Sequence, residues 1–415
     1  MSPQQTGLSK TRLLRTGFDR LPKAARRAGR RLLCLLCLAA CLTALLFVPA
    51  SAAENAALSA EIDQALRRYQ AIGAAVVIAK DGEIVYEHYY GIAAKSTRRP
   101  ITDRTYFRLA SVTKMVTAIR VMQLVEHGWL DLDADISEYL GFEVRNPYRP
   151  ETAVTLRMLM THTASLNLHN DYARHNYPLS EMISAQSPRK RNWYDEVPGS
   201  VYRYSNFGAG IIGSILESVT GKTIQETVEK NVFSPMGLTG AYSATLLPDQ
   251  ENIPNLYNAD GTAADTREEN LGRRWDTTPD PDRHYRINVG SLWMRPADLC
   301  QLGIMLCDMG SWQDMMILEA STVQEMMADQ RGRNGITGDT PYGLNLHREQ
   351  SLMDGKTFYG HQGMSDGILC NLYFDPETRF VFVLCSNGCN NELNNRVAKL
   401  TRRIFAPAWE AYGAE

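Results

Sequence analysis

The sequence lacks a low-complexity tract, a cysteine framework and a broad excess of positive charge, and each absence narrows the class of protein. With 44% hydrophobic and 22% charged residues among 415, the composition is that of a folded protein. A disordered chain, a collagen-like fibre and a small disulfide scaffold are thereby excluded. A chain of this length holds two or three average domains or one large α/β enzyme.

Cysteines are few, and their spacing matches no zinc pattern. Three of the eight (Cys34, Cys37 and Cys41) lie in an apolar N-terminal run. The other five are Cys300, Cys307, Cys370, Cys385 and Cys389. An odd number without a metal-type spacing predicts buried or free thiols and no metal site.

Positive charge is concentrated in the first 31 residues. Nine Lys and Arg, from Lys10 to Arg31, stand against Asp19 alone, so this segment carries +8. Because the whole chain carries −2, the remainder carries −10. A mildly acidic body has no electrostatic footprint for nucleic acid, and we expect no nucleic-acid partner.

The basic segment leads directly into an apolar run, Leu32–Val48, which carries no charge. Pro49 and the small residues Ala50-Ser51-Ala52 come next. A basic region, an apolar region and a small-residue exit are typical of an export signal. The alternative is an uncleaved anchor, which would associate with the membrane through residues 32–48. Either way, residues 1–52 predict an extracytoplasmic protein of bacterial type, whether secreted, in the cell envelope or membrane-anchored.

Strand patterns occur near both ends of the remaining chain, and helical patterns fill the middle. The expected strands are Ala74–Ala79 and Glu83–Glu87, joined by the turn Asp81-Gly82, and then Thr357–Tyr359, Gly367–Tyr373 and Phe380–Cys385. The expected helices include Ala56–Tyr69, Met115–His127, Leu156–Met160, Gly210–Val219, Pro296–Met309 and Glu392–Trp409. The polar stretch Leu246–Ile287 has no clear period and is typical of a functional or insertion loop.

The economical fold class is therefore α+β. One antiparallel sheet built from both ends of the chain is flanked by terminal helices and interrupted by a mostly helical insertion. We expect one domain over residues 53–412. Its α/β part covers about 53–110 and 288–412, and its helical part about 111–287.

The chemistry-bearing motif at the start of this insertion is Ser111-Val-Thr-Lys114. Residues three apart share a helix face, so the lysine can lie beside the serine hydroxyl. A serine is a weak nucleophile until a base takes its proton, and a lysine is a base only when burial or nearby charge lowers its pKa. The spacing alone is weak, because Ser187-Pro-Arg-Lys190 repeats it in a charged stretch.

Two further motifs come later in the chain. Tyr204-Ser-Asn206 stands before an apolar helix, where a phenol can exchange protons and an amide can hold a substrate carbonyl. A helix-entry loop with Ser205 or Asn206 as cap is the structural alternative. His361-Gln-Gly363 comes after an expected strand; the histidine can orient substrate or assist proton transfer, or be purely structural.

Ser-x-x-Lys, then Tyr-x-Asn, then a strand with a basic residue-x-Gly resembles the serine β-lactamase and penicillin-binding-protein superfamily. The chain is most similar to its class C β-lactamase-related branch of carboxypeptidases, D-amino-acid peptidases and carboxylesterases. The resemblance runs through five collinear segments, namely Ala74–Gly91, Phe107–Lys114, Leu156–Leu166, Tyr204–Gly221 and Val289–Leu299.

The resemblance implies a role for each motif residue. Ser111 would be the nucleophile, Lys114 the general base and Tyr204 a proton shuttle. Asn206 would position lysine and substrate, His361 is the third-motif residue, Gly363 lets substrate approach, and Met364 supplies a backbone N–H to the oxyanion hole with that of Ser111. His162, in Thr161-His-Thr163, aligns with a family motif and is interpreted as structural. Neither a metal nor an organic cofactor is implied.

The expected reaction is acyl transfer from a small peptide or ester, with a D-amino-acid or cell-wall-type peptide as the first choice. A carboxylesterase on small or lipid-like esters is the alternative. A penicillin-binding or sensor protein with slow turnover, or a structural module with a vestigial site, also stays open. Because His361 stands where β-lactamases use Lys, β-lactams are expected as acylating ligands rather than as efficiently hydrolysed substrates.

Overall fold

The hairpin predicted at Asp81-Gly82 begins the central sheet of the protein. The computed structural model describes residues 50–167, 177–332 and 340–413. Residues from 57 onward form one compact unit. Residues 1–49, which hold most of the predicted export signal, lie outside the described residues. Within the described ranges, no helix is long and apolar enough to cross a membrane.

Within the described residues, seven strands form one antiparallel sheet. In spatial order they are β13 (His347–Glu349), β14 (Phe358–Ser365), β15 (Ile368–Asp375), β16 (Phe380–Gly388), β1 (Gly73–Lys80), β2 (Glu83–Ala94) and β3 (Arg99–Pro100). The N-terminal strand β1 thus pairs with the C-terminal strand β16 in the middle of the sheet. The prediction of a sheet assembled from both ends of the chain is confirmed.

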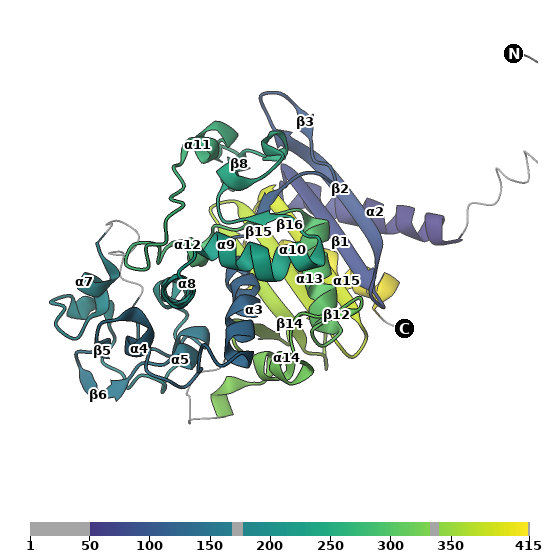
Figure 1. The fold of residues 1–415 in the computed structure, drawn as a ribbon. Helices are drawn as coiled ribbons and strands as arrows, with labels where there is room; N and C mark the ends of the chain where they lie inside the picture. Colours follow the sequence, from purple (N-terminus) through teal and green to yellow (C-terminus); the bar gives the residue numbers. More distant parts are fainter. Residues whose placement is uncertain (1–49, 168–176, 333–339, 414–415) are drawn as a thin grey trace, which may run out of the picture. The chain divides into compact units, whose positions relative to one another are not determined.

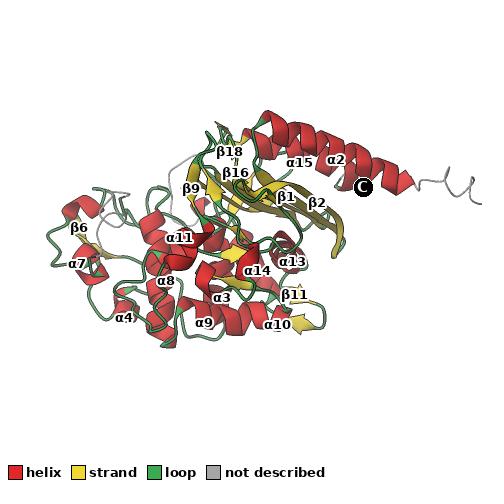
Figure 2. Ribbon diagram, turned by 90° about the horizontal axis from the view of Figure 1, so that it is seen from above, coloured by secondary structure: helices red, strands yellow, loops and turns green. Residues whose placement is uncertain are grey.

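Each face of the sheet is covered by a different layer of helices (Figures 1 and 2). The terminal helices α2 (Ala50–Arg68) and α15 (Lys399–Tyr412) pack on one face, against Val76 and Ile78. Helices α3 (Val112–Glu126) and α13 (Pro296–Cys307) pack on the other face, against Ala75 and Val77. Since successive strand residues point to opposite faces, the continuous apolar run of β1 serves both cores.

A mostly helical region comes after α3, and its first part, up to residue 183, lies to one side of the sheet in Figure 1. It contains α4 (Ser137–Leu140), α5 (Leu156–Met160), α7 (Leu179–Ile183), α8 (Asn206–Thr220), α9 (Ile224–Val228) and α10 (Ser234–Met236), with the short strands β5 (Arg145–Asn146) and β6 (Arg149–Ala153). The helices predicted at Leu156–Met160 and Gly210–Val219 are confirmed as α5 and within α8.

Short elements connect this region to the sheet and complete the chain. They are β4 (Phe107–Arg108), β7 (Gly240–Ala241), β8 (Leu256–Tyr257), β9 (Ala263–Asp265), α11 (Arg267–Gly272), α12 (Ile287–Gly290), β10 (Trp293–Met294), β11 (Ser311–Trp312), β12 (Met315–Met316) and α14 (Ala320–Met327). The α+β class expected from the sequence is confirmed.

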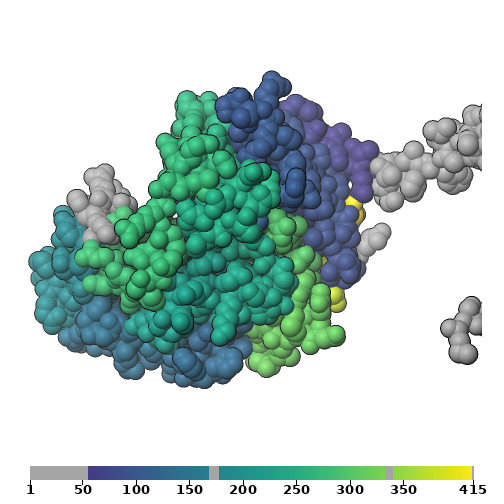
Figure 3. Space-filling view, turned by 45° about the horizontal axis from the view of Figure 1, so that its top comes forward, coloured from purple at the N-terminus to yellow at the C-terminus, as the bar shows by residue number. Residues whose placement is uncertain are grey.

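The polar stretch 246–287 is not one structureless loop. It holds β8, β9 and α11, and it packs on the end of the β2–β3 hairpin, where Asn255 N donates to Ala93 O at 2.9 Å and Arg99 donates to Ile253 O at 2.6 Å. Figure 3 shows this green segment on the surface beside the blue hairpin. Helix α11 begins with a capping box, in which the side chain of Thr266 accepts from Glu269 N. Because capping and not an apolar stripe starts this helix, its hydrophobic pattern does not predict it.

The predicted closing helix Glu392–Trp409 is wrong in its first turns. The chain there forms a small hairpin, β17 (Leu393–Asn394) and β18 (Val397–Ala398), and α15 begins only at Lys399. Asn395 and Arg396 have φ of 47° and 67°, a left-handed turn that an α-helix cannot contain. Leu393, which lies within the predicted helix, is 51% exposed.

The five cysteines of the described part of the chain are buried and free. Cys370 and Cys385 stand opposite each other on β15 and β16, with their Sγ atoms 2.9 Å apart. Burial raises the pKa of Cys370 well above its usual value, and desolvation raises that of Cys300 as well. Such thiols are inert core residues rather than nucleophiles.

Candidate active site

Ser111 and Lys114 face each other at the N-terminus of α3. Lys114 Nζ lies 2.9 Å from Ser111 Oγ and donates to the carbonyl oxygen of Val289 at 2.6 Å. Ser111 occupies the N-cap position, yet its side chain makes no capping bond. The hydroxyl of Ser111 is therefore directed to the lysine and not to the helix backbone.

Burial determines the protonation of Lys114, whose side chain is fully enclosed. Removal from water lowers the pKa of Lys114 to about 7. Near neutral pH a large share of this lysine is then an uncharged amine. A neutral amine can give one N–H to Val289 O and accept the Ser111 proton on its lone pair, as a general base must.

Close backbone packing holds the turn before Ser111. Ala110 adopts φ of 46°, a strained value for a residue with a side chain. A Cβ on Gly363 would lie 2.2 Å from Leu109 O and 2.9 Å from Ser111 N. A Cβ on Gly290 would lie 3.1 Å from the carbonyl carbon of Ala110. Only glycine fits at Gly363, so β14 runs directly against the start of α3.

Tyr204 and Asn206 reach the same place from the start of α8. Ser205 is the N-cap of this helix and accepts a hydrogen bond from Gly208 N. Lys114 Nζ lies 5.4 Å from the centroid of the Tyr204 ring. Asn206 Oδ1 is buried and accepts no hydrogen bond from the described residues. An unsatisfied amide oxygen costs free energy unless a substrate donor reaches it.

His361 and Met364 lie on β14, and the His361 ring is 6.3 Å from that of Tyr204 between centroids. His361 is almost wholly buried at 1% exposure, and its ring contacts that of His347 in a tilted arrangement, with centroids 4.1 Å apart. Strand β13 pairs only with residues 358–360 of β14, so residues 361–365 have an outer edge with no strand partner among the described residues. Such an edge is where an extended peptide can add as a further strand.

These residues line a cleft with two lobes that share Ser111, Asn206 and Met364. The first lobe, of about 410 Å³, is lined by Tyr202, Tyr204, Pro341, His347, His361 and Arg396, among others. The second, of about 370 Å³, is lined by Arg108, Ala110, Arg286, Val289, Gly290 and Ser365. The nucleophile candidate thus stands between two spaces, as needed for the two sides of a scissile bond.

Three parts of the site, the carbonyl of Val289 and the side chains of His347 and Tyr342, cannot be predicted from the sequence. The carbonyl of Val289 is a backbone atom and leaves no signal in a side-chain pattern. His347 is on the short strand β13, and Tyr342 lies just before it in a segment without periodicity. Burial beside Arg396 and Lys114 lowers the pKa of His347 to about 3, so this ring is uncharged.

The fold together with the paired Ser111 and Lys114 defines the class of an active-site serine hydrolase. Residues 58–404 match the Beta-lactamase family, and the chain belongs to that family. It lies within the serine β-lactamase and transpeptidase superfamily expected from its motifs.

Several relatives carry different activities in their names. The chain is 30% identical over 220 residues to Esterase EstB of Burkholderia gladioli, covering 49% of this chain and 55% of the esterase. It is 26% identical to a D-aminopeptidase of Brucella anthropi, covering 80% of this chain and 59% of that enzyme. The chain therefore spans little more than half the length of these two relatives.

Solved structures support the fold. A class C beta-lactamase mutant superposes with a TM-score of 0.66 at 17% identity, covering 86% of this chain and 98% of that one. A D-amino acid amidase of Ochrobactrum anthropi SV3 superposes with a TM-score of 0.64 at 20% identity, covering 86% and 99%. At this identity the likeness shows the fold alone.

Proposed function

We propose that the protein is an exported serine hydrolase that cleaves a small peptide of D-amino-acid or cell-wall type through an acyl-enzyme on Ser111. The observation that carries the proposal is the 2.9 Å contact between Ser111 Oγ and a buried Lys114 whose pKa is lowered to about 7. This contact places the hydroxyl of Ser111 beside a base that is largely uncharged near physiological pH.

The proposed reaction has two acyl transfers. Lys114 takes the proton of Ser111 as its Oγ attacks the substrate carbonyl, and the N–H groups of Ser111 and Met364 hold the oxyanion. Lys114, helped by Tyr204, returns the proton to the leaving amine, and an ester on Ser111 remains. A water molecule then attacks this ester and gives its proton to the same base, which passes it to Ser111 Oγ as the acid leaves.

Two features favour a peptide over other acyl donors. The edge of β14 at residues 361–365, which has no strand partner in the described part of the chain, suits the backbone of an extended substrate. The unsatisfied Asn206 Oδ1 suits an amide N–H. The peptidase and amidase names among the relatives support the same choice.

A carboxylesterase is the second candidate, favoured by the buried, uncharged His361 in the third motif and by the relative named as an esterase. For localisation, the basic residues 10–31 together with the adjoining Leu32–Val48 favour export or membrane anchoring. β-Lactams are expected to acylate Ser111 and to be released slowly.

Labelling with a fluorophosphonate or a fluorescent penicillin tests the nucleophile directly. We expect wild type to label and Ser111→Ala not to label. Turnover of p-nitrophenyl esters, nitrocefin and a D-Ala-D-Ala peptide then separates the substrates. Fastest hydrolysis of the peptide supports the first proposal, and fastest hydrolysis of the esters supports the second. Fastest hydrolysis of nitrocefin would contradict both.

A further inference from the structure

Two buried histidines at the active site are joined through one tyrosine hydroxyl. Tyr342 OH lies 3.2 Å from His162 Nε2 and 3.3 Å from His361 Nε2. All three side chains are at most 3% exposed. The outer nitrogens of the two rings bind backbone atoms, so the chain of hydrogen bonds is closed at both ends.

The direction of this chain can be worked out from the His361 end. His361 Nδ1 lies 2.7 Å from Gln362 O, and a carbonyl oxygen only accepts. Nδ1 therefore carries a proton, and in the neutral ring Nε2 does not. Tyr342 must then donate its O–H to His361 Nε2, which leaves its oxygen to accept from His162.

The His162 end leads independently to the same direction. Ser205 N donates to His162 Nδ1 at 3.2 Å, so that nitrogen is an acceptor and carries no proton. The neutral ring then carries its proton on Nε2 and donates it to Tyr342. The two assignments agree at the tyrosine. A proton added to His162 Nδ1 would break the bond from Ser205 N, and a proton added to His361 Nε2 would displace the hydrogen that Tyr342 donates.

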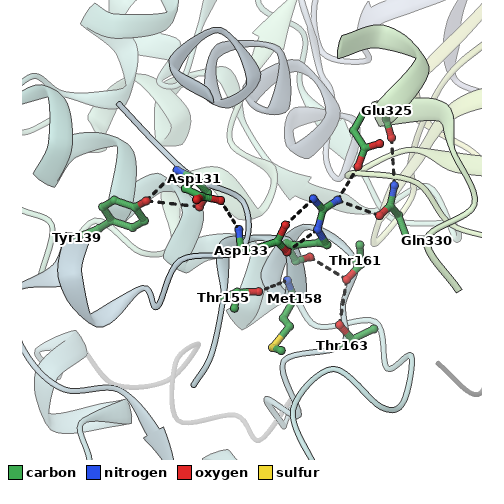
Figure 4. Close-up of polar contacts among 10 residues, drawn as sticks. Asp131, Asp133, Tyr139, Thr155, Met158, Thr161, Thr163, Glu325 and Gln330 are labelled. Carbon is green, nitrogen blue, oxygen red and sulfur yellow. Dashed lines mark hydrogen bonds and ion pairs between the residues drawn. The ribbon is translucent and has the colours of Figure 1, made fainter. Parts of the chain in front are cut away.

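The segment that carries His162 is itself firmly held. His162 comes just after α5, where Thr155 caps the helix by accepting from Met158 N and Thr161 Oγ1 donates to Arg157 O at 2.8 Å (Figure 4). The hydroxyls of Thr161 and Thr163 bond each other at 2.9 Å. The Arg157 guanidinium on the same helix pairs with Asp133 and Glu325. His162, at φ of 55°, is therefore fixed in place from both sides.

We propose that Tyr342 is a positioning residue that holds His162 and His361 as neutral rings of opposite tautomer. His361 then faces the cleft as an uncharged aromatic wall with both nitrogens occupied, and it neither donates a proton nor attracts an anion. This rests on the proposed function and deepens it: the substrate group that lies against the third motif is uncharged.

The surroundings of His361 fit an uncharged ring. The titratable and charged groups that face it are Lys114 on α3, Tyr204, His162, Tyr342, His347 on β13 and Arg396. Burial, with His347 and Lys114 adding to it, lowers the pKa of His361 well below its usual value. No carboxylate among the described residues pairs with this ring, and none is needed.

Nitrogen NMR of the 15N-histidine-labelled protein tests the assignment without reference to activity. We expect the Nε2–H tautomer for His162 and the Nδ1–H tautomer for His361, each assigned by a His→Gln variant, and both unchanged from about pH 5.5 to 8. A doubly protonated ring in that range, or the same tautomer for both rings, would overturn the proposal. The spectra that decide the proposal are those of wild type, and the His→Gln variants serve only to assign the two rings.

Tyr342→Phe then tests the tyrosine itself. Removing the hydroxyl should leave His361 Nε2 without its donor, shift its nitrogen resonance and make the ring protonate at low pH. Tyr373→Phe is the matched control, because Tyr373 is equally buried on β15 and its hydroxyl has no hydrogen-bond partner among the described residues. Unchanged tautomers and titration in Tyr342→Phe would show that the tyrosine does not position the rings.

Comparing an anionic with a neutral ester tests whether the uncharged state of His361 affects substrate choice. We expect the ratio of kcat/KM for p-nitrophenyl hemisuccinate over p-nitrophenyl acetate to be constant with pH in wild type, because protonation of Lys114, whose pKa is about 7, lowers the turnover of both esters alike. In Tyr342→Phe the ratio should rise severalfold below about pH 6.5 as His361 gains charge. A pH-dependent ratio in wild type would overturn the proposal. No hydrolysis of either ester would instead refute the proposed function while the tautomers stood.

Discussion

The chain contains Ser-x-x-Lys twice, and the two copies differ in the burial of the lysine and in the hydrogen bond of the serine. In the first, Lys114 is fully buried and 2.9 Å from the hydroxyl of Ser111. In the second, Lys190 is exposed in a single turn of 3-10 helix, and Ser187 Oγ donates to the backbone oxygen of Glu181 at 2.6 Å.

The difference lies in the residues that come after each serine. After Ser111 the apolar residues of α3 pack against the sheet and carry Lys114 inward with them. After Ser187 comes Pro188 in an exposed, charged segment, and no helix turns the lysine toward the serine. Spacing brings the two residues to one face, but burial is what makes the lysine a base.

The largest expected effect comes from removing each serine. Ser111→Ala should abolish probe labelling and lower kcat/KM by roughly three orders of magnitude or more, because no acyl-enzyme can form. Ser187→Ala, the matched variant in the second copy, should label and turn over as wild type does. Equal losses in the two variants would make the distinction between the copies untenable.

Removing each lysine should have the next largest effect. Lys114→Ala should lower kcat/KM by roughly two to four orders of magnitude, the usual result of losing a catalytic base. Lys190→Ala should leave turnover unchanged, as measured with the same ester. Activity that survives Lys114→Ala would require another base in the cleft.

Gly363 is the point where β14 touches the nucleophile turn, and Gly363→Ala should lower kcat/KM by roughly a hundredfold. Its Cβ would sit 2.2 Å from Leu109 O, so the strand or the turn must move. Gly272→Ala is the control, since no atom lies within 4 Å of its Cβ. Steady-state kinetics with thermal unfolding of both variants would separate misplacement of Ser111 from loss of the fold.

The pH dependence of kcat/KM should reflect the titration of Lys114 in the first copy and should be independent of Lys190 in the second. The base is the neutral amine, so protonation below its pKa of about 7 removes activity. We expect kcat/KM to fall about tenfold per pH unit below that value and to level off above it. A profile flat from pH 5 to 8 would contradict a lysine base, and Lys190→Ala should leave the profile unmoved.

The smallest expected effect is on stability, and it compares two serines at N-cap positions, of which one makes a capping hydrogen bond and the other does not. Ser205 caps α8 by accepting from Gly208 N, so Ser205→Ala should lower the free energy of unfolding by about 1 kcal/mol. Ser111 makes no capping bond, so Ser111→Ala should cost less. Chemical denaturation of both variants gives the comparison, and a larger cost at Ser111 would mean that its hydroxyl supports the helix.

The sequence predicts features that depend on local pattern and on the order of motifs. The β1–β2 hairpin, the helix after Ser111 and the collinear motif residues are all accessible in this way. From the sequence, the neutral state of Lys114 can only be stated as a condition for its role as a base. The burial that produces this state depends on packing among distant segments. Tyr342 and His347 cannot be found from the sequence, because their approach to His361 is set by the pairing of β13 with β14.

The same limit explains the hairpin at residues 393–398. The stripe of Leu393, Val397 and Leu400 fits a helix by spacing alone. The left-handed Asn395 and Arg396 are accommodated because Arg396 O and Ala398 N both bond the side chain of Gln362 on β14. A contact 36 residues distant in sequence thus overrides a local helical pattern.

The central pairing of β1 with β16 has a consequence for the order of folding. Ser386 Oγ donates to Gly73 O at 2.9 Å across 313 positions of sequence. Strand β1, the first strand among the described residues, therefore cannot complete its pairing until β16 has been synthesised. Contacts between residues so far apart in sequence slow folding. The polypeptide should remain without its sheet through most of its synthesis, a state well suited to threading through a narrow channel as an open chain.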